Sequence, residues 1–207
     1  MCKKVCWIML AAAMLTGCKS LEEHLAWGGD RPPDERRDFL ADLAMTVGEL
    51  PKHDPSAEAD RQMIDRFLVE RFATEEDVVA RSQILSLALQ GEFPCATALV
   101  TAAVDPEQPA SVRHTAVKGL RELSIAGRKQ LLLGTLANDS DAFVRIDAVK
   151  VIAAVGDASW ARPVVEVIVD PSENSSLRFQ SHRTANQLLG TDLPYLPSKW
   201  KAWLETN

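Results

Sequence analysis

One nine-residue pattern recurs along the second half of the chain, and this repetition constrains the fold more than any other feature. Residues 112–120 (VRHTAVKGL) realign with residues 144–152 (VRIDAVKVI) at an offset of 32. A looser copy begins at Leu177, 33 residues further on, and counting back 33 residues from the first copy reaches Val79, where the arginine comes one position late, at Arg81. Self-similarity at a fixed period in this range is typical of repeat proteins. The chain is therefore expected to contain similar units stacked one after another.

Apolar side chains from residue 34 onward recur at the three- to four-residue spacing of helices. Breaks rich in proline, glycine, asparagine and aspartate fall at residues 51–55, 91–94, 105–109 and 138–141. No alternating strand pattern competes with this spacing. The fold class predicted is all-α, built from helical hairpins.

The repeated segments resemble the HEAT-repeat family. The family pattern Asp-x-x-Val-Arg-x-x-Ala occurs at residues 141–148 and more loosely at residues 110–113, and Gly156-Asp157-Ala158 opens the next hairpin in the family's manner. Two copies depart from the pattern. The first has its arginine one position late, and the third differs at Leu177 and Ser181. The resemblance covers residues 57–190 and implies an α-solenoid, a HEAT-like superhelix of antiparallel hairpins that presents an extended surface to a protein.

At 100° per residue the repeated side chains fall into three columns. One column lies beside the core stripe and is expected to bond acidic or carbonyl groups of a neighbouring turn: Arg113, Arg145 and Arg178. A second points outward, as a solvated face or as a docking stripe for an acidic partner: Lys118, Lys150 and Arg183. A third is either covered by adjacent hairpins, which is the favoured interpretation, or exposed as an apolar strip: His114, Ile146 and Phe179. The last two columns supply the candidate partner-binding residues.

The first eighteen residues indicate export and attachment to a membrane. Lys3 and Lys4 precede an apolar run over residues 5–16, which is too short to span a bilayer as a helix. The tetrapeptide Leu15-Thr16-Gly17-Cys18 resembles a bacterial lipobox, which implies cleavage after residue 17 and a lipid on Cys18. An ordinary secretory signal followed by an unrelated cysteine is the alternative. The expected location is the bacterial cell envelope. Lys19 after the cysteine resembles outer-membrane lipoproteins, so in a two-membraned bacterium the outer membrane, facing the periplasm, is favoured.

These features divide the chain into five predicted segments. They are a cleaved signal peptide (1–17), a lipidated N-terminus with a flexible tether (18–33), a capping helix and loop (34–56), the HEAT-like repeats (57–190) and a C-terminal capping segment (191–207). Leu21, Leu25 and Trp27 leave a second interpretation of the tether open, as a short helix that docks on the body or lies in the membrane interface. Residues 34–50 are expected either to belong to the stack of helical hairpins or to cap it, and the sequence leaves both alternatives open. Trp200 and Trp203 cap its other end or form a platform for carbohydrate.

Charge and motif content argue against several function classes. The chain has 29 acidic and 23 basic residues, and cleavage after residue 17 would leave 29 and 21, an acidic balance unsuited to nucleic acid. The histidines lack the spacing of metal ligands: His24, His53, His114 and His182. No nucleophile or phosphate-binding motif occurs. Cys95 is expected to be a buried, inert thiol. No catalytic residue, metal, cofactor or small-molecule substrate is therefore expected.

The function predicted from these observations is that of a membrane-anchored lipoprotein, acting as a non-enzymatic scaffold or adaptor for an unidentified protein at the bacterial cell envelope. An envelope assembly factor or chaperone-like protein is the alternative. Some HEAT-like proteins resemble bilin lyases and others DNA glycosylases, but export, acidity and the missing catalytic groups disfavour an enzyme of either kind.

Overall fold

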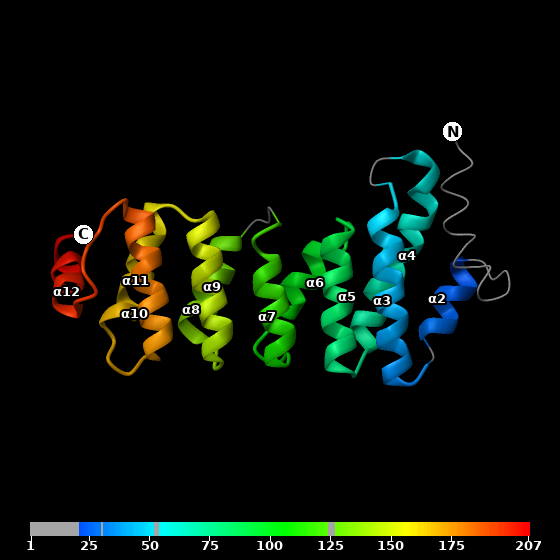
Figure 1. Cartoon of the computed structure of the whole chain (residues 1–207), viewed down its shortest axis with the longest axis horizontal. Coiled ribbons are helices and arrows are strands. Elements are labelled where there is room, and N and C mark those ends of the chain that lie inside the picture. The colour runs from blue at the N-terminus through cyan, green and yellow to red at the C-terminus, as the bar shows by residue number, and fades with distance from the viewer. Residues whose placement is uncertain (1–20, 30, 52–53, 124–126) are drawn as a thin grey trace. The chain divides into compact units, whose positions relative to one another are not determined.

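The computed structural model describes residues 21–29, 31–51, 54–123 and 127–207 (Figure 1). Within these ranges all regular structure is helical and no strand occurs, which confirms the all-α prediction. The predicted signal peptide and Cys18 lie outside the described residues, as does His53. The chain divides into two compact units, residues 1–99 and 100–207, and each is described by itself.

The first unit contains α2 (Leu21–Gly29), α3 (Pro33–Glu49), a short 3-10 turn η1 (Pro55–Ala57), α4 (Glu58–Thr74) and α5 (Val78–Gln90). Helix α6 (Ala96–Ala103) begins in this unit and crosses the division. Helix α5 packs on both α3 and α4. The largest fully buried side chains of this unit come from α4 and α5: Ile64, Leu68, Ile84, Leu85 and Leu87.

Helix α2 occupies a segment in which a flexible tether was expected. It packs against α3 and α4, and Leu25 is buried there. The expected tether is therefore wrong for residues 21–29, and the alternative of a short docked helix describes them. The physical reason is that Leu21 and Leu25 are one turn apart, so a helix places both on one face that can leave water together.

The second unit contains α7 (Ala110–Gly119), α8 (Arg128–Asn138), α9 (Ala142–Val155), a 3-10 turn η2 (Ala158–Trp160), α10 (Ala161–Val169), α11 (Ser175–Leu189) and α12 (Pro197–Thr206). Helices α7, α9 and α11 lie side by side, α7 on α9 and α9 on α11, and we call these three helices the row (Figure 1). Helix α8 packs on α9, helix α10 packs on α11, and helix α12 packs on α10. The four predicted breaks lie at or between the ends of observed helices; Asn138 is the last residue of α8, and residues 52–53 lie outside the described ranges.

The residue before the first turn fixes the register of the repeats in four helices, α5, α7, α9 and α11. Asp77, Asp141 and Asn174 cap α5, α9 and α11 by accepting backbone amide protons, and Pro109 precedes α7. The third residue after each of these positions is almost fully buried: Ala80, Val112, Val144 and Leu177. Val79, by contrast, is 51% exposed. The register predicted at Val79 is therefore wrong by one residue, and the arginine of the first copy, Arg81, is in its regular place.

The C-terminal segment closes one side of the second unit. Trp200 is fully buried, and its indole Nε1 donates a hydrogen bond to the Pro194 carbonyl at 3.2 Å. Burial excludes Trp200 from a carbohydrate-stacking platform, while Trp203 remains half-buried. Across the described residues, none of the helices combines the length and apolar character needed to cross a bilayer.

Candidate interaction surface

An arginine stands at the fourth position after the N-cap in six helices. They are Arg36 in α3, Arg61 in α4, Arg81 in α5, Arg113 in α7, Arg145 in α9 and Arg178 in α11. Three of these arginines hold a carboxylate from the segment that leads into the next helix packed alongside. The recurring arginine therefore joins neighbouring helices.

The pair between Arg113 and Asp139 is the most buried of these contacts. Nε and Nη2 of Arg113 donate to the two Asp139 oxygens at 2.8 Å each, and the side chains are only 6% and 4% exposed. Arg113 also donates to the carbonyls of Pro106 and Gln108. Burial alone would raise the pKa of Asp139, but the hydrogen bonds from Arg113 and the Asp141 amide outweigh it and leave that pKa below its ordinary value.

Arg145 repeats the arrangement one helix further on. Its Nε donates to the Leu136 carbonyl at 2.6 Å, and its two terminal nitrogens hold the Glu173 carboxylate, with Nη1 to Oε2 at 2.7 Å. The prediction that the repeat arginines bond acidic and carbonyl groups of a neighbouring turn is confirmed for Arg113 and Arg145. Arg178 differs, because no such bond is found for it among the described residues.

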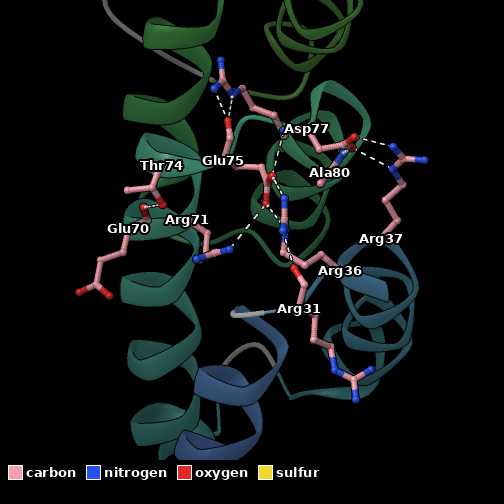
Figure 2. A network of polar contacts seen from close by, with 10 residues as sticks. Arg31, Arg36, Arg37, Glu70, Arg71, Thr74, Glu75, Asp77 and Ala80 are labelled. Carbon is pink, nitrogen blue, oxygen red and sulfur yellow. Dashed lines mark hydrogen bonds and ion pairs between the residues drawn. The ribbon is translucent and has the colours of Figure 1, made fainter. Parts of the chain in front are cut away.

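The first unit contains an equivalent network that sequence reasoning missed. Figure 2 shows Arg36 and Arg37 reaching toward Glu75 and Asp77, with Arg71 on the other side of Glu75. Arg36 binds the buried Glu75 carboxylate through Nε at 2.9 Å and Nη2 at 2.6 Å. Burial would raise the pKa of Glu75, but hydrogen bonding to Arg36 keeps it below the usual range. Counting four residues from Pro32, the residue before α3, would have found Arg36.

The exposed side chains of the row form the surface on which the six predicted partner-binding residues lie, and we call it the row face. Its outward basic column is exposed as predicted: Lys118, Lys150 and Arg183. Of the third column, His114 and Ile146 are half-buried, but Phe179 is 51% exposed. The favoured expectation that neighbouring hairpins cover this column is therefore wrong for Phe179. Phe143 on α9, which the sequence did not single out, is 72% exposed.

A buried carboxylate brings three of the six predicted residues together. Asp147 on α9 is almost fully buried, and its oxygens lie 2.8 Å from Nδ1 of His114, 3.7 Å from Nζ of Lys118 and 3.2 Å from Nζ of Lys150. Both lysines remain largely exposed while they make these contacts. Asp147 therefore fixes where the two ammonium groups lie on the row face. Sequence reasoning missed this role because helix periodicity indicates a direction and not a contact.

The charge of the row face is opposite to that of the whole chain. Asp147 is the only acidic residue within α7, α9 and α11. Residues 1–99 contain 17 acidic and 11 basic side chains, whereas residues 100–207 contain 12 of each. The net charge of −6 thus belongs to the first unit, and the row face is a basic and partly aromatic surface.

Other candidate sites offer little reactive chemistry. Cys95 is buried, as expected, and burial raises the pKa of its thiol. A groove of about 250 Å³ lies between α8 and the segment after α6, but its one ionisable side chain is Asp139, which is held by Arg113. Among the residues with described positions, no cluster of histidine, cysteine and acidic side chains is arranged to hold a metal ion.

Comparison with known proteins finds no matching family, curated protein or solved structure.

Proposed function

We propose that this chain is a non-enzymatic interaction module of the bacterial cell envelope, anchored by lipid on Cys18. In this proposal the hairpins continue as a HEAT-like α-solenoid, and the row face binds an acidic segment of a partner protein. The observation that carries the proposal is the composition of the row face. Basic and aromatic side chains are exposed there, and the single carboxylate is buried beneath them.

Electrostatics supports an acidic partner. Lys118 and Lys150, on neighbouring helices, both contact the carboxylate of Asp147, and Arg183 extends the basic column onto α11. A basic surface attracts an acidic segment of a partner, even on a chain whose net charge is negative. The solvated-face alternative explains exposed lysines but gives no role to the aromatic residues beside them.

The exposed aromatic residues support a protein as the partner. Phe143 and Phe179 expose more apolar area than most other side chains of the described chain, and they lie on the same row of helices as the basic column. Large aromatic side chains are the residues that most often anchor protein interfaces. The arginine–carboxylate pairs behind the row favour a rigid surface, which lowers the entropy lost on binding.

Photocrosslinking in intact cells tests the proposed row face. A photoreactive phenylalanine analogue replaces Phe143, and we expect it to capture an acidic protein. Lys118→Gln combined with Lys150→Gln should abolish the capture, since both neutralise the basic column without reversing the charge beside Asp147. Lys199→Gln combined with Lys201→Gln, on the exposed face of α12, is the matched control and should leave it unchanged.

Two outcomes contradict the proposed row face. One is equal capture from the exposed position Val69 in the first unit, and the other is capture that survives the loss of both row lysines in a chain with unchanged thermal unfolding. The anchor is tested separately by Cys18→Ala and membrane fractionation. We expect the variant to leave the membrane fraction, because each buried methylene of the acyl chains contributes about 0.8 kcal/mol. Unchanged retention would end that part of the proposal.

A further inference from the structure

Among the contacts between helices that pack side by side, three positions of the earlier helix recur, namely the fourth, eighth and twelfth after its N-cap. On α9 these are Arg145, Val149 and Ala153. Their partners all belong to α11 or the segment before it: Arg145 binds Glu173, the Val149 carbonyl accepts from the Thr184 hydroxyl at 3.5 Å, and the Ala153 carbonyl accepts from Gln187 at 2.7 Å. We call these three positions the leading edge of a helix.

The first unit follows the same rule. On α3 the fourth and twelfth positions are Arg36 and Ala44. Arg36 binds Glu75 ahead of α5, and the Ala44 carbonyl accepts from Gln90 near the end of α5 at 3.4 Å. The leading edge is therefore a property of the repeat and not of one pair of helices.

The leading edge of α11 consists of Arg178, His182 and Asn186, and the segment after α11 covers two of these residues. Nε2 of His182 lies 2.8 Å from the Leu193 carbonyl, which also accepts from the Asn186 amide at 2.9 Å. Arg178 has no hydrogen bond to the segment after α11; its positive charge acts on Asp170, whose pKa is lowered mainly by hydrogen bonds from Ser172 and in smaller part by Arg178. The Nε of Arg178 is buried yet has no hydrogen-bond partner within the described chain, whereas Nε of Arg113 and of Arg145 each donate to an acceptor. A buried donor without an acceptor is costly. Because the Arg178 residue as a whole is only half-buried, its guanidinium can be reached by an acceptor from outside.

Exposed apolar side chains follow this arginine on α11 and in the segment after the helix. Phe179, the next residue, packs edge to face against Tyr195 with the ring centroids 5.9 Å apart. Phe179, Tyr195 and Leu196 are all exposed, and together they form a patch of large apolar side chains. An arginine next to such a patch suits a ligand that offers a carboxylate and an apolar side chain together.

We propose that Arg178 and the patch of Phe179, Tyr195 and Leu196 form a second binding site, which takes an acidic segment of a partner protein. The carboxylate accepts from the Arg178 guanidinium, as Asp139 and Glu173 accept from the preceding arginines, and an apolar neighbour packs on the patch. This site deepens the proposed function and rests on it, since it assumes that the chain binds other proteins. Residues 139–144 of the chain (DSDAFV) combine these two features, and the carboxylate of Asp139 is the one that fills the equivalent position at Arg113.

The test is a titration of the ¹⁵N-labelled chain with a synthetic peptide of residues 139–144, followed by nuclear magnetic resonance. We expect saturable shifts of the Arg178 Nε–H signal and of the Tyr195 and Leu196 amides. Arg178→Met should weaken binding about tenfold or more, because a charge-assisted contact is lost. A peptide carrying asparagine in place of Asp139 and Asp141 should bind the unaltered chain equally poorly. Tyr195→Ala tests the patch independently and should also weaken binding.

Stability measurements separate a site residue from a structural one. Arg178→Met should leave the unfolding midpoint unchanged or raise it, since it removes a buried donor that has no hydrogen bond to lose, whereas Arg113→Met should lower it. The proposal is overturned if Arg178→Met unfolds the chain as Arg113→Met does, if it binds the peptide normally, or if Arg178 mediates only self-association of the chain. Shifts confined to Lys118, Lys150 and Arg183 would overturn this site and leave the row face standing. Loss of row-face crosslinking with retained peptide binding would overturn the row face and leave this site standing.

Discussion

Removing the carboxylate of Asp139 should destabilise the second unit more than any surface change. In Asp139→Ala the Arg113 guanidinium stays buried and loses two hydrogen bonds of 2.8 Å, keeping only the carbonyls of Pro106 and Gln108. The Asp141 amide also loses its acceptor at 2.8 Å. Breaking a buried ion pair by deleting one partner costs about 3–5 kcal/mol, because an uncompensated charge remains. We expect a loss of unfolding free energy in this range.

Tryptophan fluorescence during urea unfolding measures this loss. Trp160 and Trp200 are buried in the second unit, so their emission reports on the unit that contains the pair. Two changes confine the tryptophan signal to the second unit. Trp27→Phe removes one tryptophan of the first unit, and omitting residues 1–17 from the expressed chain removes Trp7. Asp139→Asn retains an oxygen acceptor and should cost less than Asp139→Ala.

Glu166→Ala is the matched control. Glu166 pairs with Arg162 on the surface of α10 at 3.5 Å, and the side chains are 57% and 55% exposed. An exposed pair of this kind contributes about 0.3–0.5 kcal/mol. A loss for Asp139→Ala no larger than that of the control would refute the reasoning, because it would mean that the two carbonyls alone stabilise the buried guanidinium.

Two further predictions concern the pH dependence of stability and the room for a Cβ atom at two glycines. Because the pKa values of Glu75 and Asp139 are lowered in the folded chain, the stability they contribute is present above their unfolded pKa values of about 4 and is lost as the pH falls below that point. A urea midpoint that stays constant from pH 7 down to pH 2 would contradict this. Gly156→Ala should cost about 1–3 kcal/mol, since a Cβ there would lie 2.6 Å from the Ile152 carbonyl oxygen. Gly134→Ala within α8 has open space around its Cβ and should instead stabilise the chain by about 0.5–1 kcal/mol, so equal thermal shifts in the two variants would contradict the argument.

Helix periodicity and turn residues were sufficient to predict the all-α class and the four breaks, because both depend on local sequence. The buried positions Val112, Val144 and Leu177 also follow from the repeat. The register of the first copy does not follow from a constant offset, because its helix begins one residue later than the offset implies. Asp77, the N-cap of α5, was the local signal that would have corrected it.

The contacts that define the candidate surfaces were less accessible to sequence reasoning. Arg36 and Glu75 are 39 residues apart, and Arg113 and Asp139 are 26 apart, so no local pattern connects either pair. The outward direction of Lys118 and Lys150 was predictable from the helix angle, whereas their shared contact with Asp147 depends on how α7 and α9 pack. The unsatisfied Arg178 was invisible for the same reason, since it differs from Arg145 only in what surrounds it.

The docked position of α2 changes what attachment through Cys18 would mean. Between that cysteine and the start of the helix at Leu21 there are three peptide steps, which reach about 10 Å when fully extended. An acylated N-terminus would consequently hold α3 and α4 close to the lipid headgroups, free to tilt but not to move away. A protein recruited by such a chain would have to meet it at the bilayer surface, which restricts the encounter to two dimensions.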